Sequence, residues 1–282
     1  MNVDGPRSGR VNGAIGSGRR WTQQYLPPVG LIVALLFLWQ GVGMVWSVPM
    51  WLLPSPLQIA QAGVAARLIM APHVSQTLLE TGAGLALALM VGLLFAVIVD
   101  VSAPLRRAFY PLLVVSQTIP IVALAPLLVI WFGYGILPKV LVVGLVCFFP
   151  IVIGTADGLR SADPDLIALM RTMGATRSQI FLKVRVPGAL PSFFSSLKIA
   201  VTYSVVGAII GEWVGASRGL GVFMLRASNS FRTDWVFAAI AVTALLSVIL
   251  FVIVTGLERL MLRWYYSAAR EEQWEEIGRR AQ

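Results

Sequence analysis

Long apolar runs recur along the chain, and they constrain the fold more than any other feature of the sequence. A helix that rises ~1.5 Å per residue needs about twenty residues to cross a hydrocarbon core ~30 Å thick. Only 12% of the residues are charged, whereas an average soluble domain carries about 25%. No run shows the alternation of membrane β-strands. We therefore predict an all-α integral membrane protein.

The apolar runs and the polar residues between them predict six transmembrane helices. They form a transmembrane domain over residues 27–262, between a disordered N-tail of residues 1–26 and a C-tail of residues 263–282. The segment 55–70 is apolar at helical spacing but is too short and polar to cross, so we expect a helix at the outer surface. The expected spans are Pro27–Trp46, Thr77–Val99, Phe109–Trp131, Ile136–Thr155, Ser195–Val214 and Trp235–Leu262.

The distribution of lysine and arginine predicts the orientation of the chain. Sixteen lie in the two tails and in the second and fourth loops, whereas five lie in the loops of the opposite side. Because positively charged loops remain in the cytoplasm, we expect an inner-membrane protein with both termini and the loop 158–194 on the cytoplasmic side. The net charge of +9 then needs no nucleic-acid partner to explain it.

The longest predicted cytoplasmic loop contains two helix patterns. Asp163 is a candidate N-cap before Pro164, and Gly174 is placed to end this helix as a C′ glycine. Thr176 can cap a second short helix, which we expect to stop at Pro187. Two amphipathic helices joined by a glycine fit either a loop that docks onto a partner or a helix that lies on lipid, and the pattern alone does not decide.

The sequence of this loop, "ALMRTMGATRSQIFLKVRVP", resembles the cytoplasmic loop of the permease subunits of ATP-binding-cassette (ABC) importers. The family pattern is Glu-Ala-Ala, three residues, Gly, about nine residues, Ile, one residue, Leu-Pro. Gly174 and Pro187 match its glycine and proline, and Val184 and Val186 stand at the Ile and Leu positions. Residues 168–170 are Ala-Leu-Met in place of Glu-Ala-Ala, so any ionic contact of that glutamate is missing here.

The resemblance extends over residues 111–225. "SQTIPIVALAPLLVIWFGYG", "ADGLRSADPDL" and "GEWVGASRGLGVFML" are similar to the branch that serves sulfonate, nitrate and thiamine-precursor uptake. It implies a type I ABC importer permease architecture, a homodimer, two cytoplasmic ABC ATPase subunits and an external solute-binding protein. The residues that would couple the loop to the ATPase are Met170, Gly174, Ala175, Thr176, Arg177, Ile180 and Phe181.

The sequence contains no G-x-x-x-x-G-K-[ST] phosphate loop, so we do not expect it to hydrolyse ATP. The energy for transport must then come from a partner chain. ATP and magnesium would be bound by the partner ATPase, and we expect no cofactor in this chain. The resemblance also implies that the solute passes between two permeases by alternating access.

Polar residues in the third and fifth spans are candidates for the translocation path, because polar groups that face lipid are costly. For each of them the alternative is a hydrogen bond between helices. Glu212 could meet the solute or pair with Arg218 in the same outer loop. A small polar or aromatic solute suits such a path, and "GEWVGASRGLG" looks slightly more like the thiamine-precursor permeases than the sulfonate ones. The candidates are Gln117, Thr118, Thr202, Tyr203, Ser204, Glu212 and Trp213.

A membrane-embedded enzyme and a passive channel are the alternative classes. An enzyme would need ionisable or metal-binding residues clustered within the spans. His73, the single histidine, lies in a predicted outer loop, where we expect a surface residue, and Cys147 has no partner for a disulfide or a cysteine metal site. We therefore expect no enzyme and no metal. A passive channel would not need the docking loop.

Overall fold

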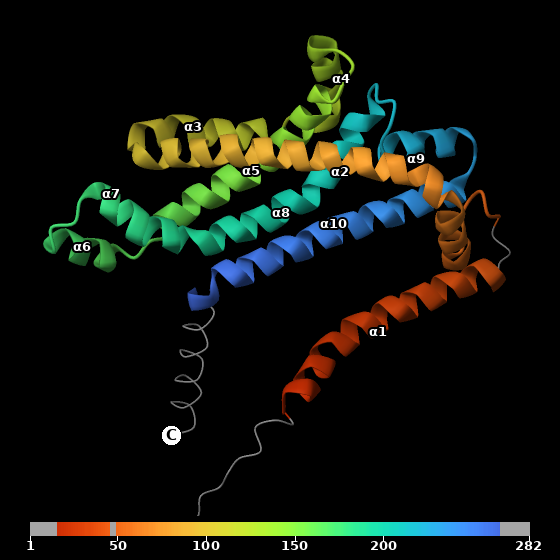
Figure 1. Ribbon diagram of the computed structural model, residues 1–282, viewed down its shortest axis with the longest axis horizontal. Coiled ribbons are helices and arrows are strands. Elements are labelled where there is room, and N and C mark those ends of the chain that lie inside the picture. The colour runs from red at the N-terminus through yellow and green to blue at the C-terminus, as the bar shows by residue number, and fades with distance from the viewer. Residues whose placement is uncertain (1–15, 46–48, 266–282) are drawn as a thin grey trace, which may run out of the picture.

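The computed structural model describes residues 16–45 and 49–265, and its regular elements in these ranges are all helical (Figure 1). Three helices form the centre of the bundle: α2 (Pro56–Val101), α5 (Leu137–Arg160) and α8 (Val186–Trp213). The helix α5 packs along both α2 and α8, and α10 (Thr233–Met261) covers α8 from the other side.

Small residues let the central helices approach closely. Gly154 of α5 faces Ser196 of α8 so tightly that an added Cβ would overlap the serine side chain. Gly84 of α2 faces Val143 of α5 in the same way. Close helix contacts through small residues are typical of membrane proteins, where burial of apolar surface does not drive helix association. The apolar core continues along this seam through Cys147.

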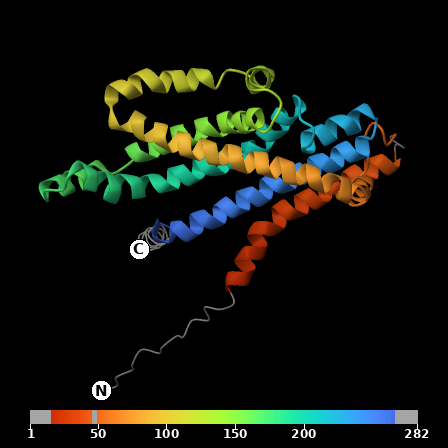
Figure 2. The same cartoon turned by 45° about the horizontal axis from the view of Figure 1, so that its top comes forward.

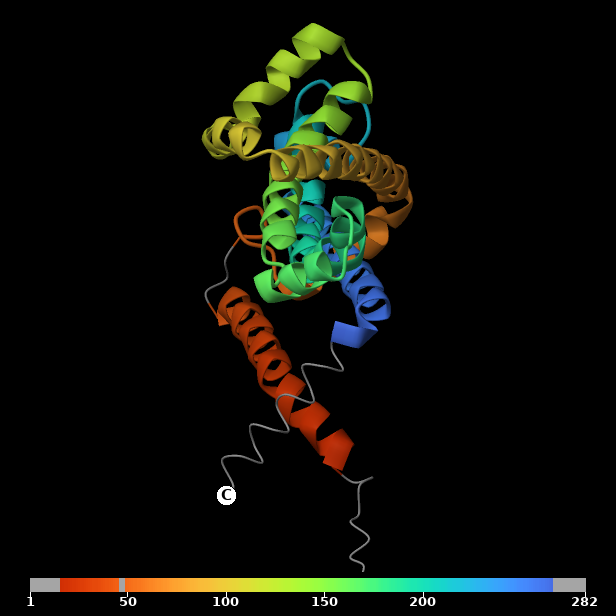
Figure 3. The ribbon, with the colours of Figure 1, turned by 90° about the vertical axis from the view of Figure 1, so that its left-hand side faces the viewer.

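The helix α1 (Gly16–Val45) lies at the edge of the bundle and contacts α2 (Figure 3). Its apolar stretch, Leu26–Val42, corresponds to the predicted first span. The predicted disordered tail of residues 1–26 is wrong over its last part, because the helix already begins at Gly16. Residues 1–15 and 266–282, which include most of both predicted tails, lie outside the described residues.

The predicted surface helix of residues 55–70 is not a separate element. It forms the first turns of α2, which starts from a capping box between Ser55 and Gln58 and continues through Pro72 to Val101. Figure 1 shows these first turns at a steep angle to the rest of α2. A proline inside a helix removes one backbone hydrogen bond and bends the helix without ending it.

The predicted third span is broken into α3 (Ala103–Ser116) and α4 (Ile121–Phe132), which meet at 98°. Pro120 stands at the start of α4, and a residue before proline is driven out of the helical conformation. The hydroxyl groups of Ser116 and Thr118 donate to carbonyl groups in the last turns of α3, at 2.8 and 2.7 Å. The expectation of one straight helix over residues 109–131 is therefore wrong.

The predicted loop 158–194 is shorter than expected and largely helical. The helix α5 continues to Arg160, and α6 (Pro164–Thr172) follows. Then α7 (Arg177–Ile180) and the π-helical turn η1 (Phe181–Arg185) run without interruption into α8. Pro187 does not stop the second short helix, because it lies in the first turn of α8, where its missing N–H is not needed.

Within the described residues, four helical segments are long and apolar enough to cross a membrane, and the bent pair of α3 and α4 would make a fifth. With the shorter apolar stretch in α1, they account for the six predicted positions. The helix α9 (Leu220–Asn229) lies between α8 and α10 at one end of the bundle, and α6 and α7 lie at the other end (Figures 1 and 2).

Candidate functional site

The bend between α6 and α7 is built around Gly174, as the sequence predicts. Its φ of +78° places it in the left-handed region that favours glycine. The amide of Ala175 donates to the carbonyl of Met170, and the amide of Gly174 to that of Arg171, both at 3.0 Å. These two bonds form a Schellman motif that closes the end of α6.

The two short helices also begin as predicted. The carboxylate of Asp163 accepts a hydrogen bond from the amide of Asp165 at 2.8 Å at the start of α6. The hydroxyl of Thr176 accepts from the amide of Gln179 at 3.3 Å, and the Gln179 side chain accepts from the amide of Thr176 at 2.8 Å. This capping box fixes the start of α7.

The predicted coupling residues do not share one surface. Gly174, Thr176 and Arg177 are exposed, whereas Ile180 is buried against the bundle. The remaining three, Met170, Ala175 and Phe181, are half-buried. An additional apolar surface on α6 faces outward through Leu166, Leu169 and Met173. The glycine bend therefore presents its tip, one side of α6 and the start of α7 to the surroundings, and the second helix packs inward only at its last residue, Ile180.

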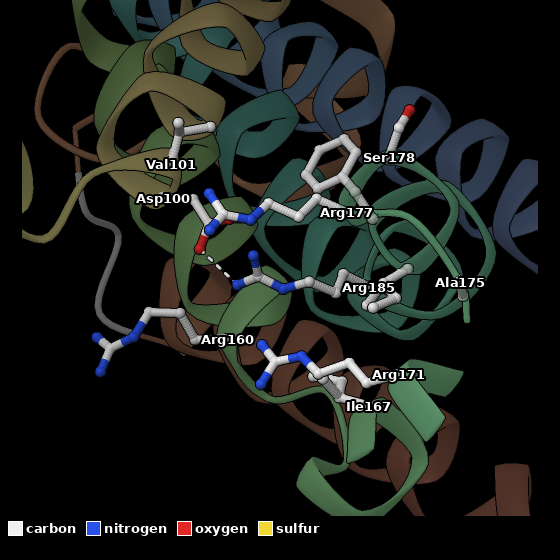
Figure 4. A pocket seen from close by; sticks show the side chains of 11 residues that line it. Asp100, Val101, Arg160, Ile167, Arg171, Ala175, Arg177, Ser178 and Arg185 are labelled. Carbon is white, nitrogen blue, oxygen red and sulfur yellow. Dashed lines mark hydrogen bonds and ion pairs between the residues drawn. The ribbon is translucent and has the colours of Figure 1, made fainter. Parts of the chain in front are cut away.

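An ion pair that the sequence reasoning missed ties the loop to the bundle. Arg185 in η1 donates from Nη2 to Oδ1 of Asp100 at 2.8 Å and from Nε to the carbonyl of Leu159 at 3.1 Å. The Asp100 side chain, at the end of α2, is only 1% exposed. The guanidinium thus joins the ends of α2 and α5 to the π turn that leads into α8 (Figure 4).

A hollow of about 930 Å³ lies between the loop and the ends of α2 and α5. Asp100, Arg160, Arg171, Arg177 and Arg185 line it together with apolar side chains. Figure 4 shows the side chains of Arg171, Arg177 and Arg185 running in the same direction, and the guanidinium group of Arg160 lying away from theirs. Three guanidinium groups therefore lie beside this space with one carboxylate, and Arg160 lines its edge.

The predicted path residues separate into an exposed and a buried group. Gln117, Thr118 and Tyr203 line a hollow of about 580 Å³ beside the bend between α3 and α4. Thr202 lines a neighbouring hollow that also reaches Tyr203. Ser204 is buried, and its hydroxyl donates to the carbonyl of Val201 at 2.6 Å. Within one chain, a solute could reach the first four residues but not Ser204.

Glu212 is buried in a polar cluster, and its predicted pairing with Arg218 is wrong. Thr77 Oγ1 donates to Glu212 Oε1, and the amide of Gly221 donates to Oε2, both at 2.5 Å. These partners come from α2 and α9, which hold the carboxylate inside the bundle. Arg218 is exposed. Trp213, next in sequence, is 50% exposed and does not share the burial of Glu212.

The same cluster contains groups that sequence reasoning treated as isolated. His73 is only 9% exposed, so the expected surface position is wrong, and its Nδ1 lies 3.0 Å from the amide nitrogen of Gly219. Glu80 accepts from the Gln76 side chain at 2.8 Å. Lys139 of α5 donates to the carbonyl of Gly135 at 2.5 Å. Across the residues that the structure describes, no group of three or more His, Cys, Asp or Glu is arranged to hold a metal.

The geometry defines the class of the protein: a polytopic helical membrane protein with a helix–glycine–helix loop fixed to one end of its bundle. The family described as "Binding-protein-dependent transport system inner membrane component" matches residues 84–263, and the chain belongs to this family. It is therefore a permease of the binding-protein-dependent ABC importers, as the resemblance of the loop indicates. Because the family consists of transport subunits, the chain is neither the membrane-embedded enzyme nor the passive channel that the sequence left as alternative classes.

Individual relatives cover nearly the whole chain. The formylaminopyrimidine transport permease protein ThiX of Halalkalibacterium halodurans is 41% identical over 86% of this chain and 96% of its own. The taurine transport system permease protein TauC of Escherichia coli is 28% identical over 87% of this chain and 93% of its own. An inward-facing structure of the MetNI methionine ABC transporter shares the fold, with a TM-score of 0.62 at 21% identity, over 70% of this chain and 98% of that one.

Proposed function

We propose that this permease admits a small aromatic solute of the thiamine-precursor pyrimidine type. One observation carries this proposal: the chain is 41% identical to the formylaminopyrimidine permease over nearly its full length, against 28% for the taurine permease. The hollow beside the α3–α4 bend suits such a solute, because Gln117, Thr118 and Tyr203 offer hydrogen bonds and an aromatic face without a charged side chain.

A sulfonate or nitrate solute is the second candidate, favoured by the similarity to the taurine permease over 87% of the chain. An anion would need a cationic partner in the hollow. Lys198 lines the neighbouring hollow beside Thr202, but its Nζ donates to Glu258 Oε2 at 2.9 Å. This ion pair neutralises the lysine, which favours an uncharged solute.

We further propose that the loop around Gly174 couples this permease to a separate cytoplasmic ABC ATPase, which binds ATP and magnesium. The exposed tip of the loop and the apolar side of α6 offer a surface for that partner. From Arg177 to Trp213 the chain is one continuous helical segment, so a displacement of the loop moves the fifth span directly. This connection is a mechanical route from ATP-driven closure to the translocation path.

The complete importer in this proposal contains two copies of the permease, two ATPase subunits and an external solute-binding protein. The hollow with Gln117 and Tyr203 opens at the surface of one chain, and a second copy would close it into a path with alternating access. Lipid would cover the apolar outer surface of α10. Both termini and the Gly174 loop would lie in the cytoplasm.

Uptake into proteoliposomes tests the solute. The permease is reconstituted with its partner ATPase and solute-binding protein, and labelled formylaminopyrimidine is supplied outside with ATP inside. We expect uptake that excess unlabelled formylaminopyrimidine abolishes and excess taurine leaves unchanged. Competition by taurine alone would instead favour the sulfonate candidate.

Replacement of Gly174 tests the coupling loop. Gly174→Val forces a β-branched residue to φ +78°, where such residues are strained, although no neighbouring atom lies within 4 Å. We expect the variant to insert normally, to lose its ATPase during co-purification and to lose uptake. Gly174→Ala should have a milder effect.

Gly133→Val is a matched control, because Gly133 has φ +76° and equally open surroundings but lies at the opposite end of the bundle. Both variants place a β-branched residue at a positive φ, and the strain at Gly133 is severe because its ψ of −176° belongs to a region that is essentially restricted to glycine. We expect this control to retain its ATPase. A Gly174→Val protein that inserts, retains its ATPase and transports normally would remove the coupling role from this loop.

A further inference from the structure

The arginine-lined hollow behind the coupling loop carries more positive charge than its own carboxylate can neutralise. Arg185 is paired with Asp100. The side chains of Arg160, Arg171 and Arg177 form no hydrogen bond or ion pair with any described residue. The guanidinium groups of Arg171 in α6 and Arg177 in α7 extend into one space beside that of Arg185, and like charges brought together without a counter-charge repel one another.

We propose that this hollow binds a phosphate ester, with the phosphate held by Arg171 and Arg177 and with Arg160 at the rim. Guanidinium groups present paired N–H donors that match the oxygens of a phosphate. Figure 4 shows the side chains of Arg171 and Arg177 extending in the same direction into the hollow, beside the paired Arg185.

Asp100 leaves the other guanidinium groups of the hollow available to a ligand. Its Oδ1 accepts from Arg185, and its Oδ2 is buried without a hydrogen-bond partner among the described residues, closed to a molecule in the hollow. The one carboxylate of the lining is therefore engaged with Arg185, and Arg171 and Arg177 can meet the phosphate of an ester.

The position of the hollow favours a lipid headgroup as the source of that phosphate. The hollow lies at the end of α2, and its lining includes the exposed apolar side chain of Val101 and the apolar side chains of Ile167 and Phe181. Basic pockets between spanning helices at the cytoplasmic side of a membrane are suited to anionic lipid headgroups. A bound headgroup would link α6 to α7, beside the ion pair that ties Arg185 to the end of α2, and so would fix the angle between the two short helices.

The test uses the full-length permease alone in an uncharged detergent, without ATPase or binding protein, so that its outcome is independent of the proposed transport function. Binding of short-chain phosphatidylglycerol is measured by native mass spectrometry and by thermophoresis. Glycerol 3-phosphate and inorganic phosphate are tested in parallel. We expect the Arg171→Gln/Arg177→Gln variant to bind phosphatidylglycerol at least tenfold more weakly.

Two further variants separate a built site from general attraction to positive charge. Arg106→Gln/Arg107→Gln removes the same charge from the start of α3, outside the hollow, and should leave binding unchanged. Arg171→Lys/Arg177→Lys keeps the charge but removes the paired donors and should bind with intermediate affinity. The elution profile and unfolding midpoint of each variant confirm that it is folded.

Each outcome decides the proposal. If the Gln variant loses phosphatidylglycerol binding, and neither glycerol 3-phosphate nor phosphate competes for the wild type, the site exists and its ligand is a lipid headgroup. If either soluble probe competes with phosphatidylglycerol for the wild type, and the Gln variant no longer binds that probe, the site exists and its ligand is a soluble phosphate compound. Equal binding by the wild type and the Gln variant, or equal losses in the Arg106/Arg107 control, overturns it.

Discussion

At the scale of single residues, Thr77 holds three helices together with one hydroxyl. It donates to Glu212 Oε1 at 2.5 Å and accepts from the amide of Leu220 at 2.9 Å, so that α2 contacts the end of α8 and the start of α9. Thr81, one turn further along α2, is equally buried, but its hydroxyl has no partner among the described residues. The two threonines form a natural pair for comparison.

We predict that Thr77→Val lowers the free energy of unfolding by about 3 kcal/mol, because a buried carboxylate and a buried amide each lose a partner. Thr81→Val, which removes an unsatisfied hydroxyl and keeps the shape, should be neutral or stabilising. Equilibrium unfolding of both variants in detergent measures the difference. Equal losses in the two variants would contradict the role of the Thr77 hydrogen bonds.

The cluster around Glu212 was only partly predictable from the sequence. His73, Thr77 and Glu80 are spaced four and three residues apart, which places them on one side of a helix and could have indicated a buried polar surface on α2. Their partners on α8 and α9 are more than 130 residues away in sequence. Spacing within one helix cannot identify contacts that depend on how separate helices pack.

At the scale of elements, the ion pair between Asp100 and Arg185 connects the loop around Gly174 to the bundle. Arg185 lies in the π turn, where the amide of Val186 donates to the carbonyl of Phe181 five residues back. Such turns are often associated with functional sites within helices. The Arg185 side chain ties this irregular turn to α2 and to the end of α5, so that the loop and the bundle move together.

We predict that Asp100→Asn makes residues 161–185 exchange their amide hydrogens at least about tenfold faster, because removal of one member of a buried ion pair leaves the other charge uncompensated. Asp157→Asn is the control, since Asp157 is an exposed carboxylate in the last turn of α5. Hydrogen exchange read by mass spectrometry measures both. Unchanged exchange in Asp100→Asn would show that packing alone holds the loop.

The helices were more predictable than the breaks between them. Apolar length located the spans, and the glycine and cap residues located the bend at Gly174, because both signals are local. The bend between α3 and α4 was missed because its apolar runs are separated only by the short segment that includes Pro120. Pro187 led to the opposite error, an expected helix end where the helix continues, because proline is tolerated in the first turn of a helix. Whether a proline ends, bends or begins a helix depends on what packs around it.

At the scale of the whole molecule, the two ends of the bundle differ in charge. The end that carries α6 and α7 also holds the start of α3 and the end of α10 (Figures 1 and 2). The lysines and arginines of these segments are therefore gathered at one end. By the positive-inside rule, we expect this end to face the cytoplasm, which is where the proposed coupling loop would reach an ATPase.

Cysteine labelling from either side of the membrane tests this orientation. Met173 at the tip of the loop is 74% exposed, and Phe231 at the opposite end is 82% exposed. Cys147→Ser removes the buried native thiol and keeps its hydrogen bond to Ala200. On this background we predict that Met173→Cys reacts with a membrane-impermeant maleimide only in inside-out vesicles, and Phe231→Cys only in right-side-out cells. The reverse pattern would place the loop outside the cell and exclude contact with a cytoplasmic ATPase.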